Sequence, residues 1–138
     1  MAVPRLRAST VCVDGDRLLL VRLRDPKSGK ARLFPPGGAV EKGETAAQAA
    51  VRETLEETGY SVRVQGPARV DNYPFVWGGV EYACETHFFR AVLLAPNPTK
   101  PVQEPIVVGI EWVPLTGVAA ALDFDPNIRE SVLALALR

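Results

Sequence analysis

The stretch Gly38–Tyr60 reads GAVEKGETAAQAAVRETLEETGY, and it predicts a loop that leads directly into a helix. Thr45, with Gln48 three residues later, has the form of a capping box, which begins a helix. Gly59 stands where a left-handed glycine commonly ends one. We therefore expect a helix that begins at Thr45 and stops at Gly59.

Small and apolar residues recur at helical spacing between these limits, and they predict the face that packs on a sheet. They are Ala47, Ala50, Val51, Thr54, Leu55 and Thr58. Glu53, Glu56 and Glu57 occupy positions i, i+3 and i+4, so they are predicted to share another face, well away from this stripe.

Three like charges on one helix face repel each other by about 0.2–0.5 kcal/mol per close pair. They also lie near the helix C-terminus, where the helix dipole favours positive charge. Conflicts of this kind with local stability are typical of functional sites. A magnesium ion, which prefers oxygen ligands and shares them with phosphate, would remove the conflict. The plainer alternative is a solvated acidic face with one Arg52–Glu56 ion pair.

The same stretch resembles the Nudix box. That box runs Gly, five residues, Glu, seven residues, Arg-Glu, an aliphatic residue, any residue, Glu-Glu, any residue, Gly and an aliphatic residue. Seven positions match in register: Gly38, Glu44, Arg52, Glu53, Glu56, Glu57 and Gly59. Thr54 and Tyr60 depart from it, since aliphatic residues are usual at these two packing positions. The chain is identified as a member of the Nudix (MutT-like) hydrolase family, with its box at residues 38–60.

The resemblance implies a metal site on the predicted helix. Glu53, Glu56 and Glu57 would bind magnesium or hold its bound waters, and the carbonyl oxygen of Gly38 would be a further ligand. Manganese is the expected substitute for magnesium.

The resemblance also implies supporting and catalytic roles. Arg52 would orient one of the glutamates, and Glu44 would support the loop, where Gly37 lets the backbone come close to a ligand. The general base differs among branches of the family. Glu57 is the candidate within the box, and Glu104, in the proline-rich loop Pro96–Pro105, is the candidate outside it; an exposed loop charge is the alternative for Glu104.

Residues outside the box are expected to select the substrate. Tyr73, Phe75 and Trp77 alternate along the chain, so they share a face and offer a surface on which a nucleobase can stack. Phe34 is a candidate wall of the same pocket, and Arg22 is a candidate phosphate contact. Core packing or a subunit interface is the alternative for the aromatic residues, and a solvated strand edge for Arg22.

The remaining pattern predicts an α+β fold, with a mixed β-sheet covered by helices on both faces in an α/β/α sandwich. The Nudix resemblance implies the same fold. The predicted strands are Ser9–Val13, Arg17–Arg24, Val62–Val70, Val80–Leu94 and Gly109–Pro114. A closing helix is predicted at Ile128–Leu137, after Asp125-Pro126, with Ile128, Val132 and Leu135 turned inward. Pro35-Pro36-Gly37-Gly38 is predicted to exclude regular structure.

The composition fits one domain spanning residues 1–138. Sixteen basic residues balance sixteen acidic ones, which argues against a nucleic-acid polymer as the partner. Cys12 and Cys84 lie in predicted strands without metal-binding spacing, so reduced, partly buried thiols are expected, with a single disulfide between them as the alternative. No apolar run reaches membrane-spanning length and Met1–Arg7 lacks the apolar stretch of a signal peptide, so we expect a cytoplasmic protein without a membrane partner.

These features predict a magnesium-dependent hydrolase. Water would attack phosphorus and cleave the diphosphate bond of a nucleoside diphosphate linked to another group. A non-catalytic nucleotide sensor is the first alternative, but a sensor has no need of the complete set of charged box residues. An isomerase of isoprenoid diphosphates is the second, and it would need a reactive cysteine in the pocket. The substrate and a homodimeric state remain open at this level.

Overall fold

The computed structural model describes all residues, 1–138, and contains one seven-stranded sheet with helices on both sides. The strands are β1 (Val3–Asp14), β2 (Arg17–Arg24), β3 (Ala31–Phe34), β4 (Gly37–Ala39), β5 (Val62–Trp77), β6 (Val80–Leu93) and β7 (Val107–Pro114). The helices are α1 (Ala46–Thr58), the 3-10 turn η1 (Leu115–Gly117), α2 (Val118–Ala121) and α3 (Pro126–Ala136).

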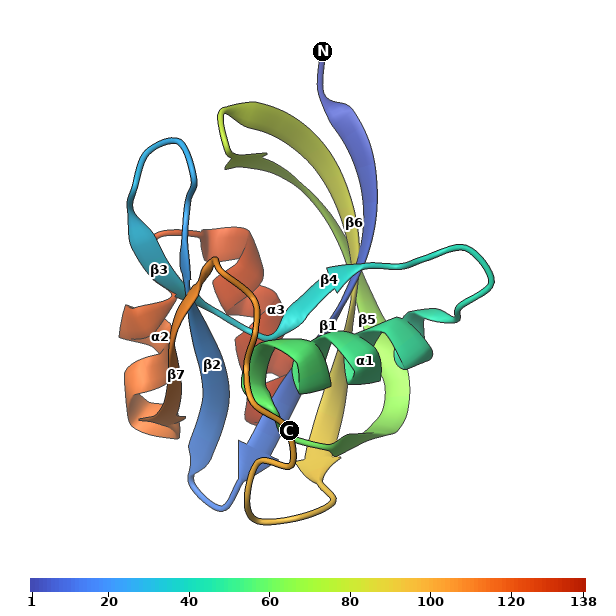
Figure 1. The fold of residues 1–138 in the computed structure, drawn as a ribbon, viewed down its shortest axis with the longest axis vertical. Helices are drawn as coiled ribbons and strands as arrows, with labels where there is room; N and C mark the ends of the chain where they lie inside the picture. Colours follow the sequence, from blue (N-terminus) through green and yellow to red (C-terminus); the bar gives the residue numbers. More distant parts are fainter.

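The sheet is mixed, with the order β3-β2-β1-β6-β5, while β4 pairs with β1 and β7 pairs with β2. β1 and β6 run parallel, and the other pairs are antiparallel. α1 packs on β1, β4, β5 and β6, and α3 packs on β1, β5 and β6 from the opposite side (Figure 1). The predicted mixed sheet with helices on both faces is confirmed.

The two ends of α1 follow the sequence signals. The Thr45 side chain accepts the N–H of Gln48, and the Gln48 side chain accepts the N–H of Thr45, which completes the capping box. Gly59 adopts a φ of 77° and donates its N–H to the carbonyl of Leu55. A side chain at Gly59 would also collide with the carbonyl of Lys100, so glycine is required there by both conformation and space.

The larger part of the core lies between the sheet and α3. Ile128, Val132 and Leu135 are buried there, which confirms the inward face predicted for the closing helix. The face of α1 that contacts the sheet is shifted around the helix relative to the prediction. Ala47, Val51 and Leu55 are only partly buried, while Ala49 and Glu57 are buried.

Pairing across the sheet explains two elements that the local pattern missed. β4 forms although Pro35-Pro36-Gly37-Gly38 was predicted to exclude regular structure. Gly37–Ala39 pairs with Arg7–Ser9, and the carbonyl of Pro36 accepts the N–H of Thr10 at 3.0 Å. β3 forms because Ala31–Phe34 pairs with the end of β2.

β5 runs to Trp77 and not to Val70, so the aromatic segment is part of a strand. A bulge between Gln65 and Arg69 absorbs Gly66, which has a φ of 72°. The strand then resumes its pairing with β6 up to the turn at Gly78-Gly79. The prediction that the aromatic residues follow the strand was wrong, because the bulge interrupts the pattern without ending the strand.

Cys12 and Cys84 are free thiols, as predicted, but both are fully buried and not partly buried. Burial raises the pKa of the Cys12 thiol to about 12. None of the helices has the length and apolar character needed to cross a membrane.

The two departures from the box pattern are packed polar residues with partners. The buried Thr54 hydroxyl is hydrogen-bonded to the Thr10 hydroxyl at 2.7 Å and donates to the carbonyl of Ala50. The Tyr60 hydroxyl accepts the indole N–H of Trp112 at 3.2 Å, and the two rings meet edge to face. Hydrogen bonds thus replace the aliphatic contacts at both positions.

We predict that Thr54→Val lowers the free energy of unfolding by about 1–3 kcal/mol, because the buried Thr10 hydroxyl loses its partner. The double variant Thr10→Val/Thr54→Val removes both polar groups and should lose less than the sum of the two single variants. Urea denaturation of all four proteins measures this difference. Additive losses would show that the two hydroxyls are not coupled.

Candidate active site

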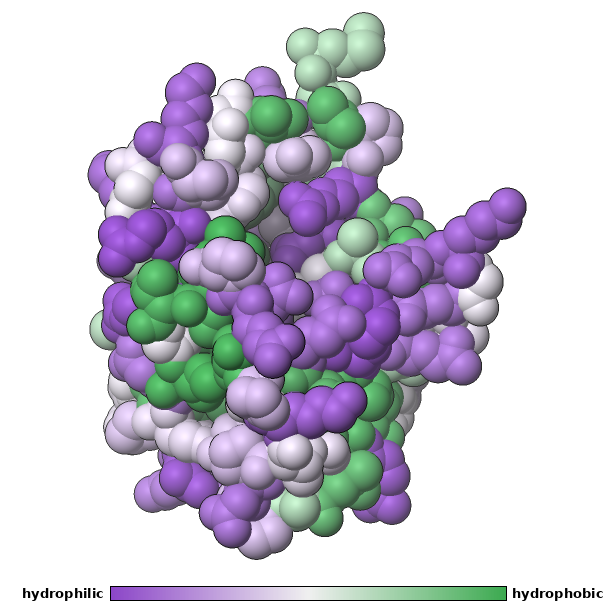
Figure 2. Space-filling model, viewed as in Figure 1, coloured by the Kyte–Doolittle hydropathy of each residue, from purple (hydrophilic) through white to green (hydrophobic).

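A cavity of about 260 Å³ lies beside β1 and β4, where the sheet, α1 and the aromatic end of β5 meet. Glu53, Glu57 and Glu104 line one part of it. Leu23, Ile106 and aromatic side chains line another part. Figure 2 shows the molecule hollowed above α1, with hydrophilic side chains beside the opening.

Glu57 is buried, with 6% of its surface exposed, and this corrects the prediction that all three glutamates lie away from the packed face. It is seven residues after Ala50 and three after Thr54, so it continues the buried stripe of α1. Its Oε1 accepts the N–H of Gly37 at 3.0 Å. Burial raises the pKa of Glu57 to about 8, with a smaller contribution from repulsion by Glu53, while the Gly37 hydrogen bond opposes the rise.

Glu53 lies against the backbone of Gly38. A Cβ atom at Gly38 would stand 2.6 Å from the Glu53 Oε2, so no larger residue fits while this carboxylate keeps its position. Burial raises the pKa of Glu53, and its hydrogen bond with Arg52 opposes that rise. The glycine of the box therefore permits a carboxylate and a backbone to meet at the cavity wall.

Arg52 is the centre of a charge network at the outer side of this wall. Its Nε and Nη2 donate to the two carboxylate oxygens of Glu44, each at 2.8 Å. Its Nη1 donates to Glu53 at 2.8 Å and, over a longer 3.3 Å, to Glu56. These contacts hold Glu53 in place and extend beyond the single Arg52–Glu56 pair considered as the alternative.

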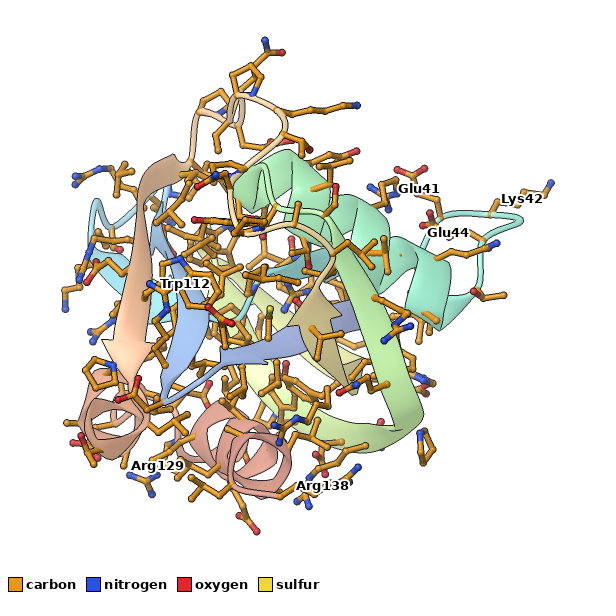
Figure 3. All side chains as sticks on the ribbon, turned by 90° about the horizontal axis from the view of Figure 1, so that it is seen from below. Glu41, Lys42, Glu44, Trp112, Arg129 and Arg138 are labelled. Atoms are coloured by element: carbon orange, nitrogen blue, oxygen red, sulfur yellow. The ribbon has the colours of Figure 1, made fainter.

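Glu44 anchors the loop before α1. Its hydrogen bond with Arg52, together with one from the N–H of Glu41, lowers the pKa of Glu44 to about 2. Figure 3 shows Glu41 and Glu44 on this loop beside α1, while Lys42 extends away from it. This arrangement fits the supporting role that the resemblance implied for Glu44.

Glu104, from the segment between β6 and β7, reaches the same cavity as Glu53 and Glu57. It is partly buried, and its charge contributes to raising the pKa of both other carboxyls. The fold brings Glu104 into the same cavity as Glu53 and Glu57, although Glu104 lies 47 positions after Glu57 in the sequence.

Comparison with known proteins assigns the family. A family model described as the NUDIX domain matches residues 3–135. The chain belongs to the Nudix family. It is 31% identical over 100 residues to a provisionally named 8-oxo-dGTP diphosphatase of Bacillus subtilis (strain 168), a match covering 72% of this chain and 59% of that protein. The match therefore spans about three fifths of the length of that curated relative.

Solved structures share the fold. The MutT protein from Methanosarcina mazei Go1 has a TM-score of 0.76 at 16% identity, with 97% of this chain and 94% of that chain covered. A NUDIX hydrolase from Nitrosomonas europaea has a TM-score of 0.72 at 24% identity, with 94% and 86% covered. At these identities the likeness establishes the Nudix fold.

Nudix hydrolases generally use divalent metal ions, and the wall of the cavity fits such an ion in part. Glu53 and Glu57 present two carboxylates there, next to the Gly38 backbone, and both have raised pKa values that a nearby cation would lower. The side chains do not form a closed group of three potential ligands. Glu56 does not line the cavity, because its exposed carboxylate is directed to Arg52. The role of Glu56 as a metal ligand, implied by the resemblance, stays a prediction.

The aromatic residues of the cavity form a compact group. The ring of Phe34 meets Phe75 and Trp77 edge to face, with centroids 5.8 Å apart in both pairs. Phe75 and Trp77 lie nearly parallel, with an interplanar angle of 16°. Tyr73 also borders the cavity, but only 5% of it is exposed and its hydroxyl is bonded to Thr86 at 2.8 Å. Tyr73 is therefore a packed residue, whereas Phe75 and Trp77 are partly accessible.

Arg22 does not reach the cavity. Its guanidinium pairs with Glu111 on the neighbouring β7 at 2.7 Å, outside the lining of the site. The prediction of a phosphate contact at Arg22 is corrected to the strand-edge alternative, because the cross-strand partner on β7 holds this side chain.

The structure adds Arg5, Arg7 and Ser9 to the cavity. They alternate on β1, so one face of this strand presents them together. The sequence prediction began this strand only at Ser9 and so missed the two arginines. Alternation of Arg5 and Arg7 ahead of the strand was the signal that could have identified them.

We predict that Glu57→Gln stabilises the metal-free protein, increasingly so as the pH rises. The folded-state pKa of about 8 exceeds the ordinary 4.5, so the parent takes up a proton on folding within this window. Its stability therefore falls as the pH rises through the window, by at most about 1.4 kcal/mol per pH unit. The variant has no such titration and keeps an amide oxygen for the Gly37 N–H.

Thermal melts of both proteins in chelator, from about pH 5 to about pH 9, measure this difference. A constant gap across the series would contradict the burial of an ionisable Glu57. In millimolar magnesium the order should reverse, because the parent gains binding energy that the variant lacks.

Proposed function

We propose that this protein is a pyrophosphohydrolase that requires magnesium, or manganese as a substitute, and cleaves a nucleoside diphosphate linked to another group. The observation that carries the proposal is one cavity with two different walls. Glu53 and Glu57 meet the backbone of Gly38 on one wall, and the Phe75–Trp77 surface forms another. The wall with the two glutamates suits a cation and a phosphate, and the aromatic wall suits a nucleobase.

The relatives support a nucleotide substrate. The name of the Bacillus subtilis relative describes a diphosphatase of 8-oxo-dGTP, and the Nudix assignment covers nearly the whole chain. Base stacking on Trp77 would orient the nucleoside, so that its phosphates point toward the glutamates.

A bound divalent ion would neutralise phosphate charge and make a water molecule more acidic. Glu53 and Glu57, with the Gly38 carbonyl as a further oxygen, would hold it, and Arg52 keeps Glu53 oriented through its 2.8 Å hydrogen bond. The attacking water forms a new bond to phosphorus as the bridging P–O bond breaks. The water proton passes to a carboxylate, for which Glu57 and Glu104 are the two candidates in the cavity. The products are two phosphate-terminated fragments.

Two other functions fit less well. A nucleotide sensor would not need the bidentate Arg52–Glu44 pair that holds Glu53 against Gly38. An isomerase would need a reactive cysteine in the pocket, but neither Cys12 nor Cys84 lines it. Burial also raises the pKa of both thiols, which suppresses the reactive thiolate. A homodimer and a cytoplasmic location stay predictions.

We predict that hydrolysis requires magnesium or manganese. The measurement is release of phosphate or nucleoside monophosphate from nucleoside triphosphates, ADP-ribose, sugar nucleotides and dinucleoside polyphosphates, with metal and with chelator. Glu53→Gln should lower kcat/KM by about 100-fold or more, because it removes metal-dependent charge stabilisation. Glu130→Gln, at an exposed site on α3, is the control and should match the parent. Full turnover in excess chelator would refute the mechanism.

We predict that Trp77→Ala raises KM by about 5- to 100-fold for a base-bearing substrate, since stacking contributes roughly 1–3 kcal/mol per base. A diphosphate compound without a base should be affected much less. Trp112→Phe is the matched control, because Trp112 lies outside the cavity and packs on Tyr60. Equal losses on both substrates would indicate that Trp77 only packs against Phe34 and Phe75.

A further inference from the structure

Arg7 is a cation at the cavity whose position no box residue explains. It lies on β1 between Arg5 and Ser9, and all three face the cavity. On one side Arg7 is in register with Ala39 of β4, and on the other with Thr86 of β6. The strand pairing on both sides fixes its backbone, so its side chain starts from a rigid position beside the glutamates.

The Nε of Arg7 is buried and has no hydrogen-bond partner, unlike every other buried side-chain nitrogen or oxygen. Arg7 also takes part in none of the ion pairs, whereas Arg22, Arg52 and Arg129 are paired with carboxylates. A buried donor without a partner destabilises the folded protein, and the more so when it is charged. The fold therefore keeps a buried guanidinium N–H without a protein partner at the lining of the cavity.

The neighbouring carboxylates do not satisfy Arg7. Glu57, whose charge interacts with that of Arg7, accepts the N–H of Gly37 and not a hydrogen bond from Arg7. Glu53 is held by Arg52. A cation bound by Glu53 and Glu57 would neutralise these two carboxylates. Arg7 would then have no counter-charge in the cavity, so a bound anion is needed to supply one.

We propose that Arg7 binds the phosphate on the nucleoside side of the scissile bond, through the planar donor fork of its guanidinium. The inference rests on the proposed function, which supplies a substrate with two linked phosphates. Glu53 and Glu57 would hold the metal ion that neutralises one phosphate, and the Arg7 guanidinium would bind the other. An arginine fork matches phosphate oxygens in geometry and charge, and hydrogen bonds to charged groups are the stronger ones.

This role makes Arg7 a specificity residue as well as an anchor. A nucleoside monophosphate, which is one product, carries the phosphate that Arg7 is proposed to bind. Its binding to Arg7 does not require the metal. The parent should therefore bind AMP more tightly than adenosine, and GMP more tightly than guanosine, even in chelator. We expect a preference of at least about tenfold, the minimum that a charged hydrogen bond implies.

Ligand-observed NMR titration in chelator measures this preference in the parent and in variants of the full chain. Arg7→Gln should bind the nucleosides as the parent does and lose the preference for the monophosphates. Arg22→Gln, whose parent residue pairs with Glu111 outside the cavity, is the matched control and should keep the preference. A full tenfold preference in Arg7→Gln would overturn the proposal. Arg7→Lys, which keeps the charge without the fork, should retain only part of it and decides the matter if Arg7→Gln does not fold.

The hydrolysis panel separates this inference from the proposed function. If the parent cleaves diphosphates with metal but Arg7→Gln has an unchanged KM and monophosphate preference, the role of Arg7 is wrong and the function stands. If the parent cleaves none of the panel yet shows an Arg7-dependent preference for AMP or GMP, the phosphate site stands and the function is wrong.

Discussion

The site depends on the close contact between the backbone of β4 and two carboxylates of α1. Gly37 donates its N–H to Glu57, and Gly38 leaves room for the carboxylate of Glu53. A side chain at either glycine would collide, at Gly37 with Ser9 and the Ala8 carbonyl and at Gly38 with Glu53 itself. The two glycines thus allow the carboxyl groups of Glu53 and Glu57 to lie at the cavity wall, although burial there disfavours their charged forms.

Arg52 compensates for this concentration of charge from outside the cavity. It holds Glu44 with two short hydrogen bonds and Glu53 with a third, so the loop before α1 and the helix are joined through one guanidinium. Glu57 has no such partner, and burial raises its pKa to about 8 although the Gly37 N–H donates to it. The two cavity carboxylates therefore differ: Glu53 is held by a cation of the protein, and Glu57 by a backbone N–H.

The cavity is also asymmetric in charge. Glutamates from α1 and from the β6–β7 segment line one part of it, and arginines of β1 line another, with aromatic rings from β3 and β5 completing the wall. Acidic and basic side chains face the same cavity. Arg7 forms no ion pair with the glutamates, and its buried Nε has no hydrogen-bond partner. A ligand that combines a metal-bound phosphate, a second phosphate and a base would match these three kinds of surface.

The sequence by itself determined α1, its two ends and its charged residues, because capping, glycine conformation and helical spacing act over a few neighbouring positions. It also indicated the mixed sheet and the inward face of α3. Only the tertiary structure decided that Glu57 is buried, that Arg22 pairs with β7, and that Tyr73 is packed while Arg7 borders the site. Those outcomes depend on which strand lies beside which, and on the bulge that carries β5 to Trp77. Contacts between residues far apart in the chain set them. The alternation of Arg5 and Arg7 shows that the two share a face, but it does not show which element that face meets.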